Sequence, residues 1–253
     1  MTEKVSKYID VFSLNKKADI EPVADAFMSG KITLLRVGPV FSLIIDPNIE
    51  GLIKKLNILK SRQKKQLMSV VCKYEQALKI VDKNRVNKDF FRLNPSFCSR
   101  AIIRIPVYTA IAPSFPYNSE EGSLQFLSFE ETHPLRSAFS DEIASRGCGY
   151  IAITSGNIGG APTIDDLEPA KDLALLLNLK ASFLGMHDIQ TVVADIPGDK
   201  GTHKGSYVIL SFCNPDAIEV KRLANKTDRE MTEKLIGELF AEVHTQTPLL
   251  YPS

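Results

Sequence analysis

The most distinctive stretch of this sequence is residues 154–163, which read Thr-Ser-Gly-Asn-Ile-Gly-Gly-Ala-Pro-Thr. The apolar residues 150–153 come directly before it and favour a buried β-strand that runs into the turn. Glycine and asparagine allow backbone conformations in which successive N–H groups point to one side, and such a turn can form a nest for an anion. A simple hydrogen-bonded loop is the other interpretation, because serine, asparagine and glycine are its usual residues.

Apolar runs and helical stripes follow one another on both sides of this turn. The periodicity predicts helices at 21–29, 49–59, 74–81, 133–145, 165–178 and 229–244. It predicts strands at 31–35, 40–45, 67–72, 101–105, 123–129, 150–153, 191–195 and 207–212. We expect 123–129 to be half-buried, 112–122 to be a surface loop and 198–205 to be a hairpin tip. Since strict βαβ regularity is absent, the pattern indicates a mixed sheet covered by helices.

Composition describes an ordinary globular protein. The 253 residues are 44% hydrophobic and 24% charged, which excludes disorder, a collagen-like repeat and a coiled coil. The 31 Lys and Arg residues nearly balance the 30 Asp and Glu residues, so the formal net charge is +1. A dedicated nucleic-acid binder usually carries marked positive charge, although a local basic patch remains open. We expect one domain over residues 1–253.

The cysteines and the apolar runs indicate a cytoplasmic protein. Cys72, Cys98, Cys148 and Cys213 are far apart and form neither a CxxC pair nor a zinc-ligand spacing. Buried free thiols in a reducing compartment are the expectation. No apolar run approaches the roughly 20 residues that a membrane span needs, so we expect no membrane segment.

A basic run, Lys-Ser-Arg-Gln-Lys-Lys, occupies residues 60–65 at the end of the predicted helix 49–59. Arginine offers a planar fork of donors and lysine a compact charge, so the run can hold a polyphosphate. The alternative is a solvated helix end, where the macrodipole favours cations. Lys60 and Arg62 diverge on a helix, so both reach one ligand only if the backbone leaves the helix there.

Other catalytic patterns are missing from the sequence. The turn at 154–163 is neither a P-loop nor a GxGxxG loop, and no GxSxG elbow occurs. The four histidines show no metal-ligand spacing, so we expect no fixed metal site. Asp195 ends a predicted strand, where it serves either as a catalytic or magnesium-facing carboxylate or, as such residues more often do, as a turn cap.

Taken together and in order, these segments resemble the YrdC family, whose best-known members are threonylcarbamoyl-AMP synthases. Lys-Ser-Arg at 60–62 resembles the family's Lys-x-Arg, and His-Pro-Leu at 133–135 resembles its His-Pro-Leu helix start. Residues 154–160 resemble its Ser-Ala-Asn-x-Ser-Gly turn, and 191–195 resemble its Ser-Thr-Val-Val-Asp strand. The resemblance covers about residues 20–215 and leaves 216–253 as a helical C-terminal extension.

The resemblance implies an α/β fold with a twisted mixed sheet and flanking helices around a concave basic pocket. It implies condensation of L-threonine, bicarbonate and ATP into threonylcarbamoyl-adenylate with release of pyrophosphate, for later modification of a tRNA adenosine. Mg²⁺ would bridge the ATP phosphates. Lys60 and Arg62 are the candidate catalytic residues. The candidate nucleotide- and substrate-binding residues are Lys65, Thr154, Ser155, Asn157, Asp195 and Arg36.

The chain departs from the family pattern around the amino-acid and adenylate sites. Arg-Val-Gly-Pro at 36–39 stands where the family has Pro-Thr-x-Thr, and 126–129 lacks the arginine of the family's Val-Arg-Val. The family's Pro-Gly-Pro-x-Thr segment has no clear counterpart. Arg36 is a candidate replacement for the lost arginine. Because such losses change substrate discrimination, two alternatives stay open. One is a non-catalytic module that binds RNA or a nucleotide, and the other is a carbamoyl-adenylate enzyme acting on a different amine.

Overall fold

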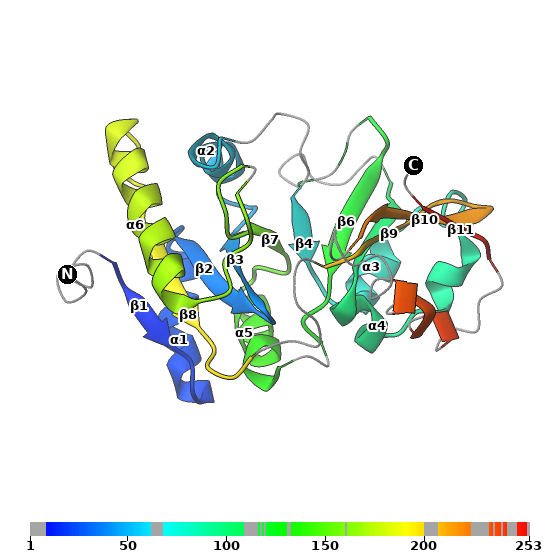
Figure 1. Ribbon diagram of the computed structural model, residues 1–253, viewed down its shortest axis with the longest axis horizontal. Helices are drawn as coiled ribbons and strands as arrows, with labels where there is room; N and C mark the ends of the chain where they lie inside the picture. The colour runs from blue at the N-terminus through cyan, green and yellow to red at the C-terminus, as the bar shows by residue number, and fades with distance from the viewer. Residues whose placement is uncertain are drawn as a thin grey trace. The chain divides into compact units, whose positions relative to one another are not determined.

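The computed structural model describes residues 9–61, 68–108, 116, 118, 120–130, 133–159, 161–199, 207–223, 233–234, 236–238, 240–241 and 247–251. The chain divides into two compact units, which are described separately. The first comprises residues 1–66 and 133–203, and the second comprises 67–132 and 204–253. Figure 1 labels their helices and strands. The assignment of 1–253 to a single domain stays a prediction.

The first unit contains a mixed sheet with the strand order β1-β8-β2-β3-β7. The strands are β1 (Val11–Ser13), β8 (Thr191–Asp195), β2 (Ile32–Val37), β3 (Val40–Ile45) and β7 (Ile151–Ser155). β8 pairs in parallel with β1 and with β2, whereas β3 is antiparallel to both β2 and β7. The register places Arg36 opposite Phe41 and Ser42 opposite Ser155. The end of β7 and the β2–β3 hairpin therefore lie next to each other.

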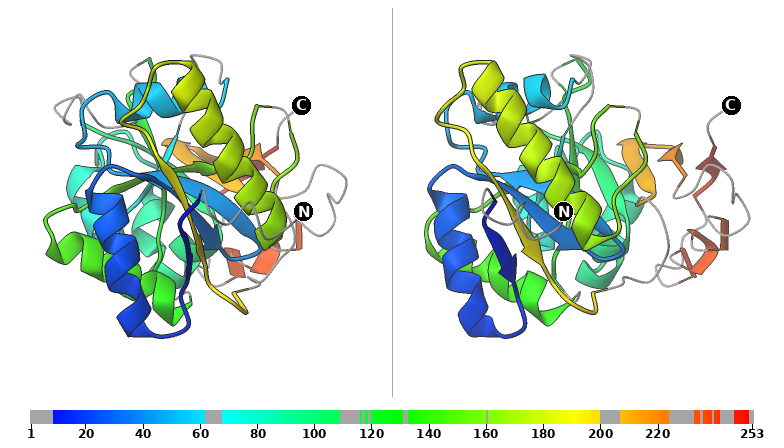
Figure 2. Two further views of the ribbon diagram at one scale, coloured as in Figure 1. Left: turned by 90° about the vertical axis from the view of Figure 1, so that its left-hand side faces the viewer. Right: turned by 60° about the vertical axis from the view of Figure 1, so that its left-hand side comes forward.

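Two pairs of helices cover this sheet. They are α1 (Ile20–Met28), α5 (Pro134–Ser145), α2 (Leu52–Leu59) and α6 (Leu167–Phe183). Helix α1 lies in the connection from β1 to β2, and α6 lies in the connection from β7 to β8. These two connections cross the sheet in opposite directions. Because such crossovers are right-handed, the two helices lie on opposite faces of the sheet. Figure 2 shows α1 beside α5 on one face and α2 beside α6 on the other. Phe27 of α1 and Phe139 of α5 pack edge to face with ring centroids 6.1 Å apart.

The second unit contains strands in the order β4-β6-β5-β9-β10-β11. They are β4 (Ser69–Val71), β6 (Ser123–Leu127), β5 (Ile102–Pro106), β9 (Ile209–Asn214), β10 (Ala217–Arg222) and β11 (Leu249–Leu250). The short helices α3 (Tyr74–Ile80) and α4 (Pro95–Arg100) and a 3-10 turn (Lys88–Arg92) belong to the same unit. The buried ring of Phe90 meets Tyr74, Phe126 and Phe212 edge-on at 5.6 to 6.3 Å and forms the centre of its core.

The sequence predictions agree with most element positions. The predicted helix 21–29 corresponds to α1, and the predicted strands 40–45 and 191–195 correspond to β3 and β8. Gly30, expected to stop α1, has a positive φ of 87°, a conformation that favours glycine. Helix α6 continues to Phe183, five residues beyond the prediction. The mixed α/β class is therefore confirmed.

Three expectations about strands were wrong. β8 and β9 do not form a hairpin, because β8 pairs with β1 and β2 while β9 pairs with β5 and β10. All five residues of β6 are buried, so this strand is not half-buried. Residues 216–253, expected as a helical extension, include strands β10 and β11.

Parts of some predicted elements lie outside the described residues. They are the hairpin tip from residue 200 onward, most of the loop at 112–122, and most of the helix at 229–244, of which 233–234, 236–238 and 240–241 are described as helical.

All four cysteines are free thiols. Cys72, Cys98 and Cys148 are buried as expected, whereas Cys213 is partly exposed. Burial raises the pKa of the Cys72 and Cys98 thiols, and burial together with the carboxylate of Asp46 raises the pKa of Cys148 to about 12. Among the described residues, no helix is both long enough and apolar enough to cross a membrane.

We predict that Ellman's reagent at pH 8 modifies Cys213 first and the three buried thiols only slowly. The thiolate is the reactive form, and burial suppresses both its formation and its access to the reagent. In guanidinium chloride all four thiols should react rapidly. Two or more thiols that react in the native protein at the denatured rate would contradict the described burial.

Candidate functional site

The ammonium group of Lys60 connects the end of helix α2 to the glycine-rich turn after β7. Lys60 follows the last residue of α2, whose buried leucines fix the helix against the core, and only 2% of Lys60 is exposed. Its Nζ donates to the carbonyl oxygen of Ser155 and lies 3.4 Å from both Thr154 Oγ1 and Asn157 Oδ1. A buried ammonium needs oxygen partners to replace its hydration, and the turn supplies them.

The backbone at the end of α2 is held by the same turn and by helix α6. The amide of Gly159 donates to the Lys60 carbonyl at 3.1 Å. Lys180 Nζ of α6 donates to the Leu59 carbonyl and to Ser61 Oγ, both at 2.8 Å. Ser61 has a positive φ of 52°, so the chain leaves the helix directly after Lys60. From the sequence, the backbone has to leave the helix at this point if Lys60 and Arg62 are to reach one ligand.

The turn itself is internally bonded. Ser155 Oγ lies 2.7 Å from Asn157 Oδ1, and Asn157 Nδ2 donates to the Ala161 carbonyl at 2.5 Å. Gly156 donates its N–H to the Phe41 carbonyl of β3 at 2.8 Å. A Cβ atom on Gly156 would lie 2.5 Å from that carbonyl oxygen, so only glycine fits there without movement of the backbone.

Arg36 forms a second cluster on the other side of Phe41. Its guanidinium carbon lies 4.5 Å from the centre of the Phe41 ring, which is cation–π geometry. Its Nε is 2.5 Å from Asp195 Oδ1, and its Nη1 donates to the Asp165 carbonyl at 3.0 Å. Both charged side chains are largely buried. Phe41 therefore contacts both clusters, through its carbonyl to Gly156 and through its ring to Arg36.

The structure thus brings the predicted residues into two neighbouring groups. Lys60, Thr154, Ser155 and Asn157 form the first, and Arg36 and Asp195 form the second. The remaining predicted residues, Arg62 and Lys65, lie outside the described part of the chain. Whether any of these residues binds a ligand stays a prediction.

A buried ion pair next to the β2–β3 turn was not predicted. Arg136 Nε of α5 lies 2.9 Å from Asp199 Oδ2, and both side chains are almost fully buried. The same carboxylate oxygen accepts the N–H of Gly38 at 3.1 Å. Helical spacing offered a signal, because Arg136 shares the buried face of α5 with Phe139 and Ile143. Nothing in the sequence indicated that Asp199 would be its partner.

Within the residues that the structure describes, no three His, Cys, Asp or Glu side chains gather in a way that could hold a metal ion.

No protein-family model matches the chain, and no curated protein matches its sequence with significance. Solved structures do match it. Sua5 of P. abyssi in complex with L-threonine has a TM-score of 0.59 and 16% sequence identity, and the match covers 91% of this chain and 61% of Sua5. YciO of E. coli has a TM-score of 0.60 and 10% identity, over 85% of this chain and 93% of YciO.

Full-length HypF in its phosphate- and nucleotide-bound form also matches, with a TM-score of 0.59 and 20% identity, over 81% of this chain and 29% of HypF. The chain therefore spans about three fifths of the length of Sua5 and under a third of that of HypF. At these identities the likeness shows the fold, and the expected YrdC-like fold is confirmed.

We predict that Gly156→Ala lowers the free energy of unfolding by about 1 to 3 kcal/mol, because its Cβ would overlap the backbone carbonyl of Phe41. Gly159→Ala is the matched control in the same turn, since its Cβ would meet the nearest atoms at 3.4 and 3.5 Å, an ordinary contact. Urea unfolding of both variants measures the difference. Equal stability of the two variants would contradict the close approach of the turn to β3.

Proposed function

We propose that this chain is a nucleotide-binding enzyme that forms a carbamoyl-adenylate from ATP, bicarbonate and a small amino acid, with L-threonine as the first candidate. The observation that carries the proposal is the contact of Lys60 with Ser155, Thr154 and Asn157. These residues come from the two segments that resemble the Lys-x-Arg and Ser-x-Asn motifs of threonylcarbamoyl-AMP synthases. The fold shared with P. abyssi Sua5, whose structure was solved in complex with L-threonine, supports the same reaction class.

The proposed reaction joins three substrates in two bond-forming steps. The amine nitrogen bonds to the bicarbonate carbon with loss of water and gives a carbamate. A carbamate oxygen then attacks the α-phosphorus of ATP, and pyrophosphate leaves. Both steps gather negative charge, so catalysis depends on cations placed where the charge develops.

Lys60 would supply one of these cations. Its contacts to Thr154 Oγ1 and Asn157 Oδ1 are long, at 3.4 Å, so an incoming phosphate oxygen can replace one of them while the Ser155 carbonyl keeps its bond. Arg62 and Lys65 are proposed to add charge from the following residues. Mg²⁺ would enter with the ATP phosphates, since this ion keeps few protein ligands in such sites.

Arg36 would distinguish this site from that of the family. Its Nε and Nη1 are bonded to Asp195 and to the Asp165 carbonyl, and its face packs on Phe41. A guanidinium held this way presents its remaining N–H groups in a fixed direction, which suits the carboxylate of an amino acid. In this chain Arg36 stands where the family's Pro-Thr-x-Thr motif supplies hydroxyl groups. The main alternative substrate in the proposed reaction is therefore an amine other than threonine.

A non-catalytic nucleotide or RNA module is the second candidate. The burial of Lys60 favours this candidate. With only 2% of the residue exposed, Lys60 can serve as a purely structural link between α2 and the turn. A module that binds RNA through phosphates would lose affinity steeply as salt rises, since each contact releases counterions.

The direct test incubates the protein with ATP, Mg²⁺, labelled bicarbonate and single amino acids and measures pyrophosphate release, and a separate titration measures ATP binding. We expect one small amino acid to raise release above the background without amine. ATP binding without stimulation by any amino acid would identify the binding module, and the catalytic proposal would then be wrong. Absence of both ATP binding and pyrophosphate release would remove the nucleotide as ligand.

In the ATP titration we predict that Arg62→Ala weakens binding by at least about tenfold without change in melting temperature, because a charge-assisted hydrogen bond to phosphate contributes roughly 1.5 to 3 kcal/mol. The matched control is Lys54→Ala, which removes an exposed cation from α2. Lys60→Ala should also lower stability, because three oxygen atoms would lose their partner. Equal affinities for the Arg62 and Lys54 variants would exclude Arg62 from the site.

A further inference from the structure

A row of polar side chains crosses the sheet of the second unit. The register places Arg104 of β5 opposite Gln125 of β6 and opposite Ser211 of β9. Ser211 is in turn opposite Glu219 of β10, and Ser69 Oγ of β4 lies 3.4 Å from the Gln125 amide. Residues that are opposite in register share a face of the sheet, so this row extends over five strands.

The polar row is buried at its centre, whereas Glu219 at one end is partly exposed. Ser211 and Gln125 are buried, and the Arg104 side chain is only 14% exposed. Burial of polar groups is costly unless they are hydrogen-bonded. With the Gln125 amide oriented so that its oxygen faces Arg104, that oxygen accepts from Arg104 Nε at 3.1 Å and also from Nη2. The strands therefore hold the guanidinium of Arg104 in one orientation.

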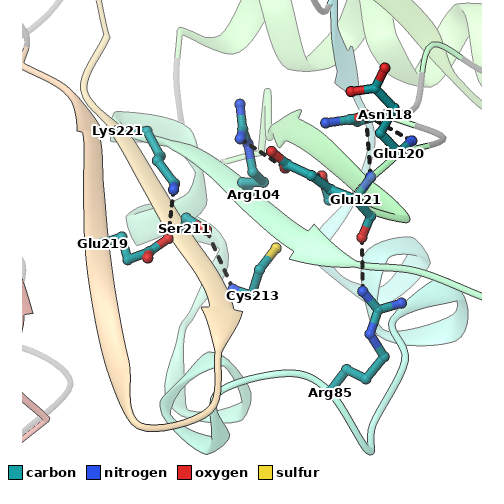
Figure 3. A network of polar contacts seen from close by, with 10 residues as sticks. Arg85, Arg104, Asn118, Glu120, Glu121, Ser211, Cys213, Glu219 and Lys221 are labelled. Carbon is teal, nitrogen blue, oxygen red and sulfur yellow. Dashed lines mark hydrogen bonds and ion pairs between the residues drawn. The ribbon is translucent and has the colours of Figure 1, made fainter. Parts of the chain in front are cut away.

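The remaining side of that guanidinium faces the carboxylate of Glu121. Arg104 Nη1 and Ser123 Oγ both lie 3.1 Å from the same oxygen, Glu121 Oε2. Figure 3 shows the Glu121 carboxylate beside Arg104. The Glu121 side chain is 53% exposed, whereas Ser123 is fully buried. Two fixed donors on the sheet thus converge on one oxygen that an exposed turn supplies.

A second arginine holds the turn that carries this carboxylate. Arg85 Nη2 donates to the Glu121 carbonyl at 2.8 Å (Figure 3). A Cβ atom on Gly122 would lie 3.0 Å from Arg85 Nη1, and Gly122 has a positive φ of 59°. The guanidinium of Arg85 therefore lies directly against this turn. Arg85 thus fixes the backbone of the turn, while Arg104 meets the carboxylate that the turn carries.

We propose that Arg104 and Ser123 form a binding site for an oxyanion, a phosphate or carboxylate group, and that Glu121 occupies this site when no ligand is bound. The donors are placed by buried strands, while the carboxylate belongs to an exposed side chain that can rotate away. An ion pair with a solvent-exposed carboxylate adds little to stability, so a ligand oxyanion can displace Glu121 from the two donors. A phosphate offers more charge and more acceptor oxygens than Glu121 does. This site is independent of the function proposed above.

Cys213 provides a local reporter for the site. Burial raises the pKa of its thiol, Arg104 lowers that pKa, Glu121 raises it and Arg85 lowers it. Removal of the Glu121 charge should therefore lower the pKa of Cys213 and speed its alkylation. Binding of an anion next to Arg104 should slow the alkylation again.

The test compares Glu121→Gln with Glu120→Gln, which removes the same charge from the neighbouring residue. Each protein is titrated with phosphate, and separately with acetate, at ionic strength held constant with sodium chloride. The readouts are the melting temperature and the rate of Cys213 alkylation by iodoacetamide, followed by peptide mass spectrometry. In Glu121→Gln we expect phosphate to bind at least about tenfold more tightly than in the wild type and to slow the alkylation of Cys213.

A third variant, Glu121→Gln combined with Arg104→Lys, keeps the positive charge but removes the fork that bonds both Gln125 and the ligand. It should lose the phosphate response. A response to phosphate alone identifies a phosphate site, and a response to acetate as well extends it to carboxylates. Equal responses of the Glu121 and Glu120 variants, or a full response without Arg104, would overturn the proposal.

Discussion

The ammonium group of Lys60 is almost completely removed from water, and a buried charge costs several kcal/mol unless oxygen atoms replace its hydration. Those atoms come from Thr154, Ser155 and Asn157, about 95 residues later in the chain. The turn is held in return, because the Gly159 amide donates to the Lys60 carbonyl. Helix α2 and the turn after β7 therefore fix each other, and the candidate site depends on this mutual constraint.

Strand β3 extends the constraint to the second charged cluster. The Phe41 carbonyl binds the Gly156 amide, and the Phe41 ring lies under the guanidinium of Arg36. Asp195 then fixes Arg36 from β8. Both clusters are thus attached to rigid strands, which is the arrangement that precise placement of charge requires. In the second unit, Arg104 is placed on the same principle, by the buried side chains of Gln125 and Ser211 on the neighbouring strands.

Much of this arrangement could be predicted from the sequence. Hydrophobic periodicity located most helices and strands, and the ordered motifs indicated that Lys60 and residues 154–157 belong to one site. The burial of Lys60 could not be predicted, because a cation at a helix end is usually solvated. The partner of Arg136 was hidden for another reason: Asp199 is 63 positions away, and only the fold brings it close.

Strand pairing was the weakest part of the sequence analysis. Neighbouring strands in sequence often form hairpins, and residues 191–195 and 207–212 were expected to do so. β8 instead takes parallel partners on both sides, β1 and β2. Parallel pairing joins segments that are distant in sequence, so no local signal reports it. The burial of the polar face of β6 was missed because alternation of side chains does not tell what covers each face.

Amide hydrogen exchange at Gly156 and Gly159 tests the link through Lys60 most directly. Both amides donate to backbone carbonyls, so both should exchange slowly in the wild type. In Lys60→Met, compared with the exposed-residue control Lys54→Met, both should exchange at least about tenfold faster. Unchanged protection of both glycines in a folded Lys60→Met protein would contradict the account.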